Sequence, residues 1–212
     1  EAANAVGDRK ALVARSLPPL FGSYRPDLFD AERAPRILSV LVEGQSLDVD
    51  FWLAESQSSI QEARAVRDAL KDDARPLWLS FTLKDEDPDP DNPCLRSGEP
   101  VSNAVRAAVQ LGAKSILFNC SQPEVMGNAV DIAREVISEN GSDLLTGVYA
   151  NAFPDIGDEV EANTGLLRIR RDLDPPSYVD FARDWVGRGA TIIGGCCGIG
   201  PAHIAELRRA FG

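Results

Sequence analysis

The stretch Thr191-Ile192-Ile193-Gly194-Gly195-Cys196-Cys197-Gly198 decides how the rest of the chain is interpreted. The apolar run 190–193 predicts a short buried strand. Two glycines, two adjacent cysteines and a third glycine follow it, and residues 202–211 predict a helix. The cysteine pair is therefore expected just past the carboxyl end of a strand, in the turn before a helix. In parallel α/β folds, ligands bind at that edge of the sheet.

Strand-like and helix-like segments alternate along the chain, which predicts βαβ units and a parallel sheet. The predicted strands are 11–14, 50–54, 76–82, 115–118, 144–149 and 190–193. The predicted helices are 34–43, 59–70, 101–111, 123–139, 177–186 and 202–211, and residues 1–10 predict the tail of another. Residues 155–164 predict a polar loop. The acidic, proline-rich segment 84–100 predicts an exposed loop, and such loops are more often merely solvated than lids or linkers.

The composition excludes several classes of function. A chain of 212 residues can form one sizeable core. Its net charge of -11 argues against a nucleic-acid partner, whose phosphates need a basic face. The sequence has no apolar run of ~18 residues, so we expect no membrane span. Its 4 cysteines are too few for a disulfide scaffold, which predicts free thiols in a reducing, cytoplasmic setting.

Three cysteines, Cys120, Cys196 and Cys197, each follow a predicted strand. Because the carboxyl ends of parallel strands share one rim, these thiols can converge. Three thiolates are good zinc ligands, and three protein ligands with one open position are typical of a catalytic zinc site. Cys94 lies in the acidic loop, and His203 is expected to anchor the first turn of the last helix. Zinc in such a site would hold an incoming thiol as a thiolate, the reactive form.

Other interpretations of the same residues stay open at this point. Cysteine often packs as a small buried hydrophobic residue, and the adjacent pair could form a redox couple, although a vicinal disulfide is strained and rare. Glu55 could bind the amino group of a substrate, or it could be an acid that opens the following helix, which is the more common role. Asn119 and Asn151 could hydrogen-bond a substrate or could form turns.

Several segments carry a resemblance to a known family. Gly194-Gly195-Cys196-Cys197-Gly198, followed by Pro201-Ala202-His203-Ile204, resembles the highly specific C-terminal signature of the homocysteine S-methyltransferase family. Less specific matches run in the same order across nearly the whole chain: Ala54-Glu55-Ser56 with Glu62-Ala63, Trp78-Leu79-Ser80-Phe81-Thr82, Phe118-Asn119-Cys120-Ser121-Gln122-Pro123 and Tyr149-Ala150-Asn151. Ser56 stands where Thr is usual in the family, and Ala150 stands where Pro is usual.

The resemblance implies a (β/α)8 TIM barrel and a Zn2+ cofactor held by Cys120, Cys196 and Cys197. It implies that homocysteine binds as a thiolate and takes a methyl group from a sulfonium, ammonium or folate donor, giving methionine. S-methylmethionine or S-adenosylmethionine is the expected donor, because betaine-type members tend to carry long C-terminal extensions and folate-type members further domains. Selenohomocysteine and selenocysteine are further candidate acceptors.

The same resemblance implies roles for three more residues. Glu55 would take the amino group of homocysteine, and Asn119 and Asn151 would line the site.

One departure from the family pattern concerns the start of the chain. The Asp-Gly-Gly-type first strand and the Thr- and Asn-rich second strand of the family are not found in this sequence. Because six predicted strands cannot close an eight-stranded barrel, we expect residues 1–212 to be a homocysteine-binding barrel domain that lacks about the first two βα units. This departure keeps one alternative open, a homocysteine- or metal-binding barrel protein without turnover. The adjacent cysteine pair leaves a second, less favoured alternative, a thiol redox protein.

Overall fold

The computed structural model describes residues 11–45, 49–89, 91–154 and 168–212. Within these residues one parallel sheet has the strand order β1-β2-β3-β4-β5-β6. The strands are β1 (Ala14–Leu17), β2 (Phe51–Gln57), β3 (Leu77–Phe81), β4 (Ser115–Asn119), β5 (Leu145–Tyr149) and β6 (Ile192–Ile193). The helices are α1 (Ala34–Gln45), α2 (Ile60–Ala69), α3 (Val101–Gln110), α4 (Met126–Glu139), α5 (Pro175–Arg188) and α6 (Pro201–Phe211). The described residues also form two short 3-10 helices in loops, η2 (Pro26–Leu28) and η3 (Pro123–Val125).

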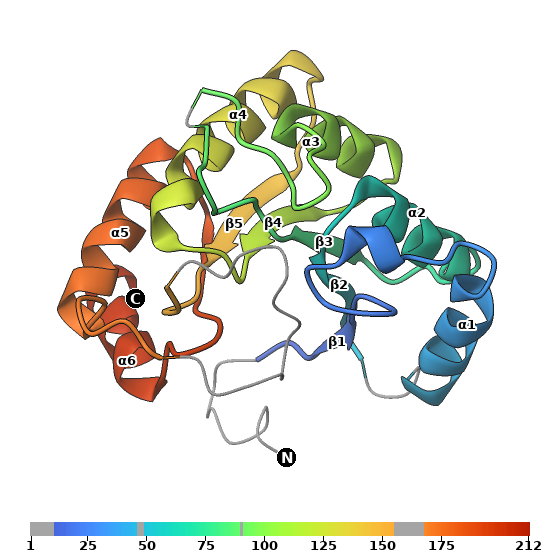
Figure 1. The fold of residues 1–212 in the computed structure, drawn as a ribbon, viewed down its shortest axis with the longest axis horizontal. Coiled ribbons are helices and arrows are strands. Elements are labelled where there is room, and N and C mark those ends of the chain that lie inside the picture. Colours follow the sequence, from blue (N-terminus) through green and yellow to red (C-terminus); the bar gives the residue numbers. More distant parts are fainter. Residues whose placement is uncertain (1–10, 46–48, 90, 155–167) are drawn as a thin grey trace.

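Each strand is followed by a helix, and strands consecutive in sequence are neighbours in the sheet. Figure 1 shows the helices in an arc from α1 to α6 around the outer side of the strands. This single winding, with helices outside and strands inside, is the arrangement of a (β/α)8 barrel rather than of a doubly wound open sheet. The described part of the chain is thus an α/β fold that corresponds to part of such a barrel, as expected.

The core lies between the sheet and the arc of helices. Strand side chains that face the helices are fully buried, and they meet the small and branched side chains of the helices. Among the buried strand residues are Trp52, Ala54, Leu77, Leu79, Phe81, Ile116, Phe118 and Val148. Helix α3 buries three alanines and two valines on one face, which lets it approach the sheet closely. The core therefore fixes the positions from which the loops at the carboxyl ends of the strands start.

Two helices begin at capping residues that are visible in the sequence. Ser59 accepts a hydrogen bond from the backbone of Glu62, whose side chain reaches back to the cap in a capping box. Asp174 caps α5 before Pro175. Glu62, rather than Glu55, is thus the acid at the start of α2, and Glu55 lies within β2 instead of after it.

The predicted strands and helices are confirmed, with shifted ends. Strand β1 lies three residues later than expected, because Leu17 pairs with Ala54 and the more apolar run before Ala14 stays outside the sheet. The predicted helix tail in 1–10 and the predicted loop in 155–164 lie outside the described residues. None of the helices that the structure describes is both long and apolar enough to cross a membrane.

The prediction that segment 84–100 is simply an exposed loop is wrong for part of it. Asp85, Leu95 and Arg96 are buried, and bridges join Leu83 to Leu95 and Cys94 to Pro100. Arg96 Nη2 lies 2.6 Å from Asp85 Oδ1, so each charge has its partner inside the protein. An acidic, proline-rich composition predicts that each residue of the segment is exposed. It does not reveal that Asp85 pairs with Arg96.

Candidate metal and substrate site

Three thiols converge at the carboxyl ends of β4 and β6. Cys196 Sγ lies 3.0 Å from Cys120 Sγ, Cys120 Sγ lies 3.6 Å from Cys197 Sγ, and the two adjacent sulfurs are 3.8 Å apart. All three cysteines are free thiols; Cys120 is buried, Cys196 is half-buried and Cys197 is exposed. The three sulfur atoms lie close enough to bind one metal ion together, as the sequence predicts.

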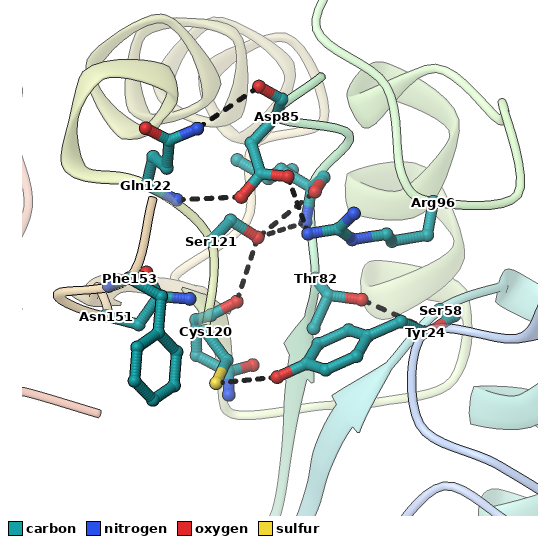
Figure 2. Close-up of polar contacts among 12 residues, drawn as sticks. Tyr24, Ser58, Thr82, Asp85, Arg96, Cys120, Ser121, Gln122, Asn151 and Phe153 are labelled. Carbon is teal, nitrogen blue, oxygen red and sulfur yellow. Dashed lines mark hydrogen bonds and ion pairs between the residues drawn. The ribbon is translucent and has the colours of Figure 1, made fainter. Parts of the chain in front are cut away.

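Side chains from other loops hold the turn after β4. Cys120 has a φ of 50°, an uncommon left-handed conformation for a residue other than glycine, and its N–H donates to Tyr149 O at 3.2 Å. Tyr24 Oη donates to Cys120 Sγ at 2.9 Å (Figure 2). Ser121 Oγ accepts from the N–H of Leu83 at 2.8 Å. Cys120 is therefore fixed both at its backbone and at its sulfur.

Backbone hydrogen bonds and glycines hold the turn after β6. Cys196 N–H donates to Ala150 O at 2.9 Å, and Ala152 N–H donates to Cys197 O at 2.8 Å. A Cβ atom at Gly195 would lie 2.1 Å from Ile199 Cγ2, so the turn needs a glycine there. This turn joins the one after β5, and together they bring Cys196 and Cys197 to Cys120.

The packing of the three thiols shifts their pKa values in opposite directions. Hydrogen bonds from Cys120 and Cys196 hold the pKa of the Cys197 thiol well below its usual range. The pKa of Cys196 is raised, because its thiol donates to Cys120 and Cys197 and because it is buried. One thiolate therefore forms readily while its neighbours resist ionising beside it, and a divalent cation would offset that repulsion. The sulfur donor set fits a soft-ligand metal such as zinc.

Glu55 lies on the inner side of the sheet and is held by two hydroxyl groups. Ser16 Oγ donates to Glu55 Oε2 at 2.7 Å, and Tyr149 Oη donates to Glu55 Oε1 at 3.3 Å. Burial, and then the charge of Glu55, raises the pKa of Tyr149 well above its usual value, so this phenol stays a donor. Glu55 and Tyr149 share a cavity of about 200 Å³ with Gly194 and Gly195. The carboxylate thus faces the same cavity as the turn that carries the cysteine pair.

The two predicted site asparagines have different surroundings. Asn119 is fully buried, accepts from Ser80 Oγ at 2.7 Å and donates to Ser56 Oγ at 2.7 Å. Ser56 has a φ of 58°, so Asn119 holds a strained residue next to Glu55. Asn151 is buried, and its Oδ1 accepts from Phe153 N–H at 3.2 Å. Asn151 Nδ2 has no hydrogen-bond partner among the described residues.

The chain matches the sequence model of the family "Homocysteine S-methyltransferase" over residues 1–211. The chain belongs to the homocysteine S-methyltransferase family. It is 25% identical over 212 residues to homocysteine S-methyltransferase of Escherichia coli (strain K12), covering 93% of this chain and 62% of that protein. It is 30% identical over 169 residues to S-methylmethionine–homocysteine S-methyltransferase of Pongo abelii, with 76% and 44% covered. It is 31% identical over 169 residues to betaine–homocysteine S-methyltransferase 1 of Bos taurus, with 76% and 39% covered.

The fold is also similar to a solved structure of this family. The crystal structure of the homocysteine methyltransferase MmuM from Escherichia coli, apo form, superposes with a TM-score of 0.69 at 22% identity. That match covers 98% of this chain and 65% of the other. The chain thus spans less than two thirds of the length of these relatives. Its cluster of Cys120, Cys196 and Cys197 is typical of the zinc site in this homocysteine S-methyltransferase family.

The sequence did not reveal the hydroxyl groups around the site. Ser16 lies in β1 and Tyr24 in the loop after it, and none of the segments that resemble the family includes them. The available signal was their position, because loops after strands of a barrel line the site rim. The sequence could not identify which of their hydroxyl groups reaches Glu55 and which reaches a sulfur.

Proposed function

We propose that residues 1–212 form the homocysteine-binding barrel domain of a zinc-dependent homocysteine S-methyltransferase. It would move a methyl group from a sulfonium donor, S-methylmethionine or S-adenosylmethionine, to the thiolate of homocysteine, giving methionine. The observation that carries this proposal is the convergence of three thiols that the chain separates by up to 77 positions. Free thiols are required, so a reducing, cytoplasmic setting is part of the proposal.

Cys120, Cys196 and Cys197 would hold the Zn2+ ion. Bound zinc would lower the pKa of an incoming thiol and keep its sulfur nucleophilic at neutral pH. Cys197 is exposed and Cys120 is buried, so substrate would approach the cluster from the Cys197 side. The proposal needs all three thiols, because the ends of β4 and β6 together supply one donor set.

Glu55 would bind the amino group of homocysteine. Ser16 and Tyr149 already hold its carboxylate, so little reorganisation is needed when an ammonium group arrives. The cavity that Glu55 shares with Gly194 and Gly195 connects this carboxylate to the cysteine turn, which suits a substrate with an amine at one end and a thiol at the other.

The two asparagines would support the same substrate. Asn119 would act through Ser56, since both ends of its amide are bonded within the protein. The buried Nδ2 of Asn151 would donate to a substrate carboxylate.

In the proposed reaction the homocysteine sulfur attacks the methyl carbon of the donor. A new sulfur–carbon bond forms as the donor's sulfur–carbon bond breaks, and the electron pair stays on the donor sulfur, which leaves as a neutral thioether. Since no proton moves in this step, the residues need to orient and desolvate the reactants rather than supply an acid or base. A relative named for S-methylmethionine supports a sulfonium donor. Another relative is named for betaine, so an ammonium donor is the second donor class to test.

The test begins with metal analysis of the reduced full chain. We expect zinc bound to the unsubstituted protein, zinc lost from the Cys196→Ser variant, and zinc retained by the Cys94→Ser variant, whose thiol lies outside the cluster. The zinc-loaded protein is then incubated with homocysteine and S-methylmethionine, S-adenosylmethionine or betaine in turn, and methionine is measured. Absence of zinc, or zinc unaffected by Cys196→Ser, would contradict the proposal.

A second candidate function is homocysteine or metal binding without turnover. The observation that favours it is that the thiol cluster and the cavity beside Glu55 would suffice to bind a metal ion or an amino thiol. It predicts that calorimetry detects homocysteine binding and that no methionine forms from any of the donors. Methionine formation from any one of them would exclude it.

A further inference from the structure

A closed ring of contacts leads away from Cys120 and returns to it. Tyr24 Oη donates to Cys120 Sγ at 2.9 Å, and the Cζ atom of Arg96 lies 5.1 Å from the centre of the Tyr24 ring. Arg96 Nη2 lies 2.6 Å from Asp85 Oδ1, and Asp85 Oδ2 accepts from Gln122 N–H at 3.0 Å. Gln122 is two residues past Cys120, so the ring closes through the backbone. Figure 2 shows these residues facing one another.

Three separate loops build this ring. Tyr24 comes from the loop after β1, Asp85 and Arg96 from the loop after β3, and Cys120 and Gln122 from the turn after β4. The charged side chains of Arg96 and Asp85 are each 1% exposed, a degree of burial that a merely solvated loop would not show. A buried ion pair is a weak source of net stability, so its placement beside the site calls for another role.

The backbone on both sides of the contact to sulfur is strained. Tyr24 has a φ of 65° and Cys120 a φ of 50°, and neither is a glycine. Such conformations persist where the surrounding structure dictates them, and they gather at functional sites. Here the strain directs a phenol at a thiol that is already 3.0 Å from another thiol.

We infer that Tyr24 is a positioning residue for Cys120, that the Arg96–Asp85 ion pair holds Tyr24 in place, and that this contact tunes the Cys120 sulfur as a metal ligand. The inference rests on the proposed function in that it takes Cys120 as a ligand. An O–H donor on a thiolate draws electron density from the sulfur and fixes its direction. Partners of this kind around a metal site commonly matter about 10- to 100-fold for metal affinity or activity.

Arg96 suits this role because of its shape. A guanidinium can lie over an aromatic face and bind a carboxylate at the same time, since its charge is spread over a plane. The cation over the ring also makes the phenol a stronger hydrogen-bond donor. A lysine in the same place would keep a charge beside Asp85, yet it would lack the planar contact with Tyr24.

The test uses the full chain loaded with Co2+, whose thiolate-to-cobalt charge-transfer band reports how strongly the sulfurs donate. Tyr24→Phe removes the hydroxyl and keeps the ring. We expect the band to move to longer wavelength and the affinity for Zn2+ to fall about tenfold. The matched control is Tyr178→Phe, which removes a buried phenol that donates to Gly194 O at 2.9 Å and to no sulfur; its band should stay unchanged.

A second comparison tests the part played by Arg96. Arg96→Lys should move the band in the same direction as Tyr24→Phe, and it should add nothing when combined with Tyr24→Phe, because its effect passes through the hydroxyl. If Arg96→Lys does not fold, the comparison of Tyr24→Phe with Tyr178→Phe still decides the role of Tyr24. An unchanged band in metal-loaded Tyr24→Phe, or an equal shift in Tyr178→Phe, overturns this inference but leaves the proposed function standing. An unsubstituted chain with no charge-transfer band overturns the three-thiolate site, and with it the proposed function.

Discussion

The turn after β4 and the turn after β6 both supply cysteines to one site, and they are held in different ways. Around Cys120, side chains from distant loops bond the sulfur and the adjacent backbone, and the thiol is buried. Around Cys196 and Cys197, the holding contacts are mainly backbone hydrogen bonds and glycines, with one side-chain bond from Tyr178 to Gly194 O, and Cys197 is exposed. We call the buried half, Cys120 with the turn after β4, the anchor. We call the glycine-rich half, residues 194–198, the arm.

The difference indicates how a site can be both ordered and open. A sulfur that is fixed by hydrogen bonds and a buried ion pair needs little further ordering when a metal binds. A glycine turn brings two sulfurs near it while leaving Cys197 exposed. Substitutions in the anchor should therefore cost stability through buried charge, whereas substitutions in the arm should cost it through steric crowding.

The largest expected effect is that of Arg96→Met, which would remove the cation beside buried Asp85. We expect the free energy of unfolding to fall by about 3–5 kcal/mol, because the carboxylate would stay buried without its partner. Urea unfolding measures this loss. The control is Arg209→Met at an exposed ion pair with Glu206, where we expect a loss of at most about 1 kcal/mol. Equal losses would show that the anchor does not depend on this pair.

Cys120→Ser and Cys197→Ser test the two halves as ligands. A zinc site with four ligands is worth roughly 10–16 kcal/mol, so one ligand contributes about 3 kcal/mol, or about 100-fold in affinity. We expect a loss of that size from either variant in a competition titration with a zinc chelator. Without metal, Cys120→Ser should also destabilise the fold by about 1–3 kcal/mol, since it places a hydroxyl at a buried position, and exposed Cys197→Ser should not. Equal free energies of unfolding for the two metal-free variants would contradict the distinction between anchor and arm.

Gly195→Ala tests the arm by crowding it. The added methyl group would meet the Ile199 side chain at 2.1 Å, so we expect a loss of about 1–3 kcal/mol in urea unfolding. Ile199→Ala in the same chain should recover part of the loss in a double-mutant cycle. Gly44→Ala in α1 is the control, because nothing lies within 4 Å of its added carbon and alanine favours a helix. No recovery in the double variant would mean that the turn is held by something other than this contact.

The smallest expected effect concerns the reactivity of the metal-free, reduced chain with iodoacetamide. The pKa of Cys197 is held below its usual range, so its thiolate persists down to low pH and is lost only as pH falls through that lowered pKa. We therefore expect its alkylation rate to stay nearly constant from about pH 5 to 8, whereas an unperturbed thiol slows about tenfold per pH unit over that range. Mass spectrometry of the labelled peptides measures the rates. Faster labelling of buried Cys120 than of Cys197 would contradict the assignment of anchor and arm.

The sequence by itself determined the alternation of strands and helices and the placement of three cysteines after two strands. Both follow from local patterns, because apolar runs, glycines and capping residues act within a few positions of the chain. The strand ends were less certain: β1 begins at Ala14 because pairing with β2, rather than local apolar character, sets its register. The glycine and cysteine signature at 194–198 indicated the site without any tertiary information.

Only the tertiary structure decided which side chains surround those cysteines. The contact of Tyr24 with Cys120 joins residues 96 positions apart, and that of Ser16 with Glu55 joins residues 39 positions apart. The first contact depends on the path of the loop after β1, and the second depends on the pairing of β1 with β2; no local pattern encodes either. Asp85 and Arg96 lie only 11 positions apart in one loop, yet composition does not predict their burial, because a charge enters the interior only when the fold of that loop brings its partner to it.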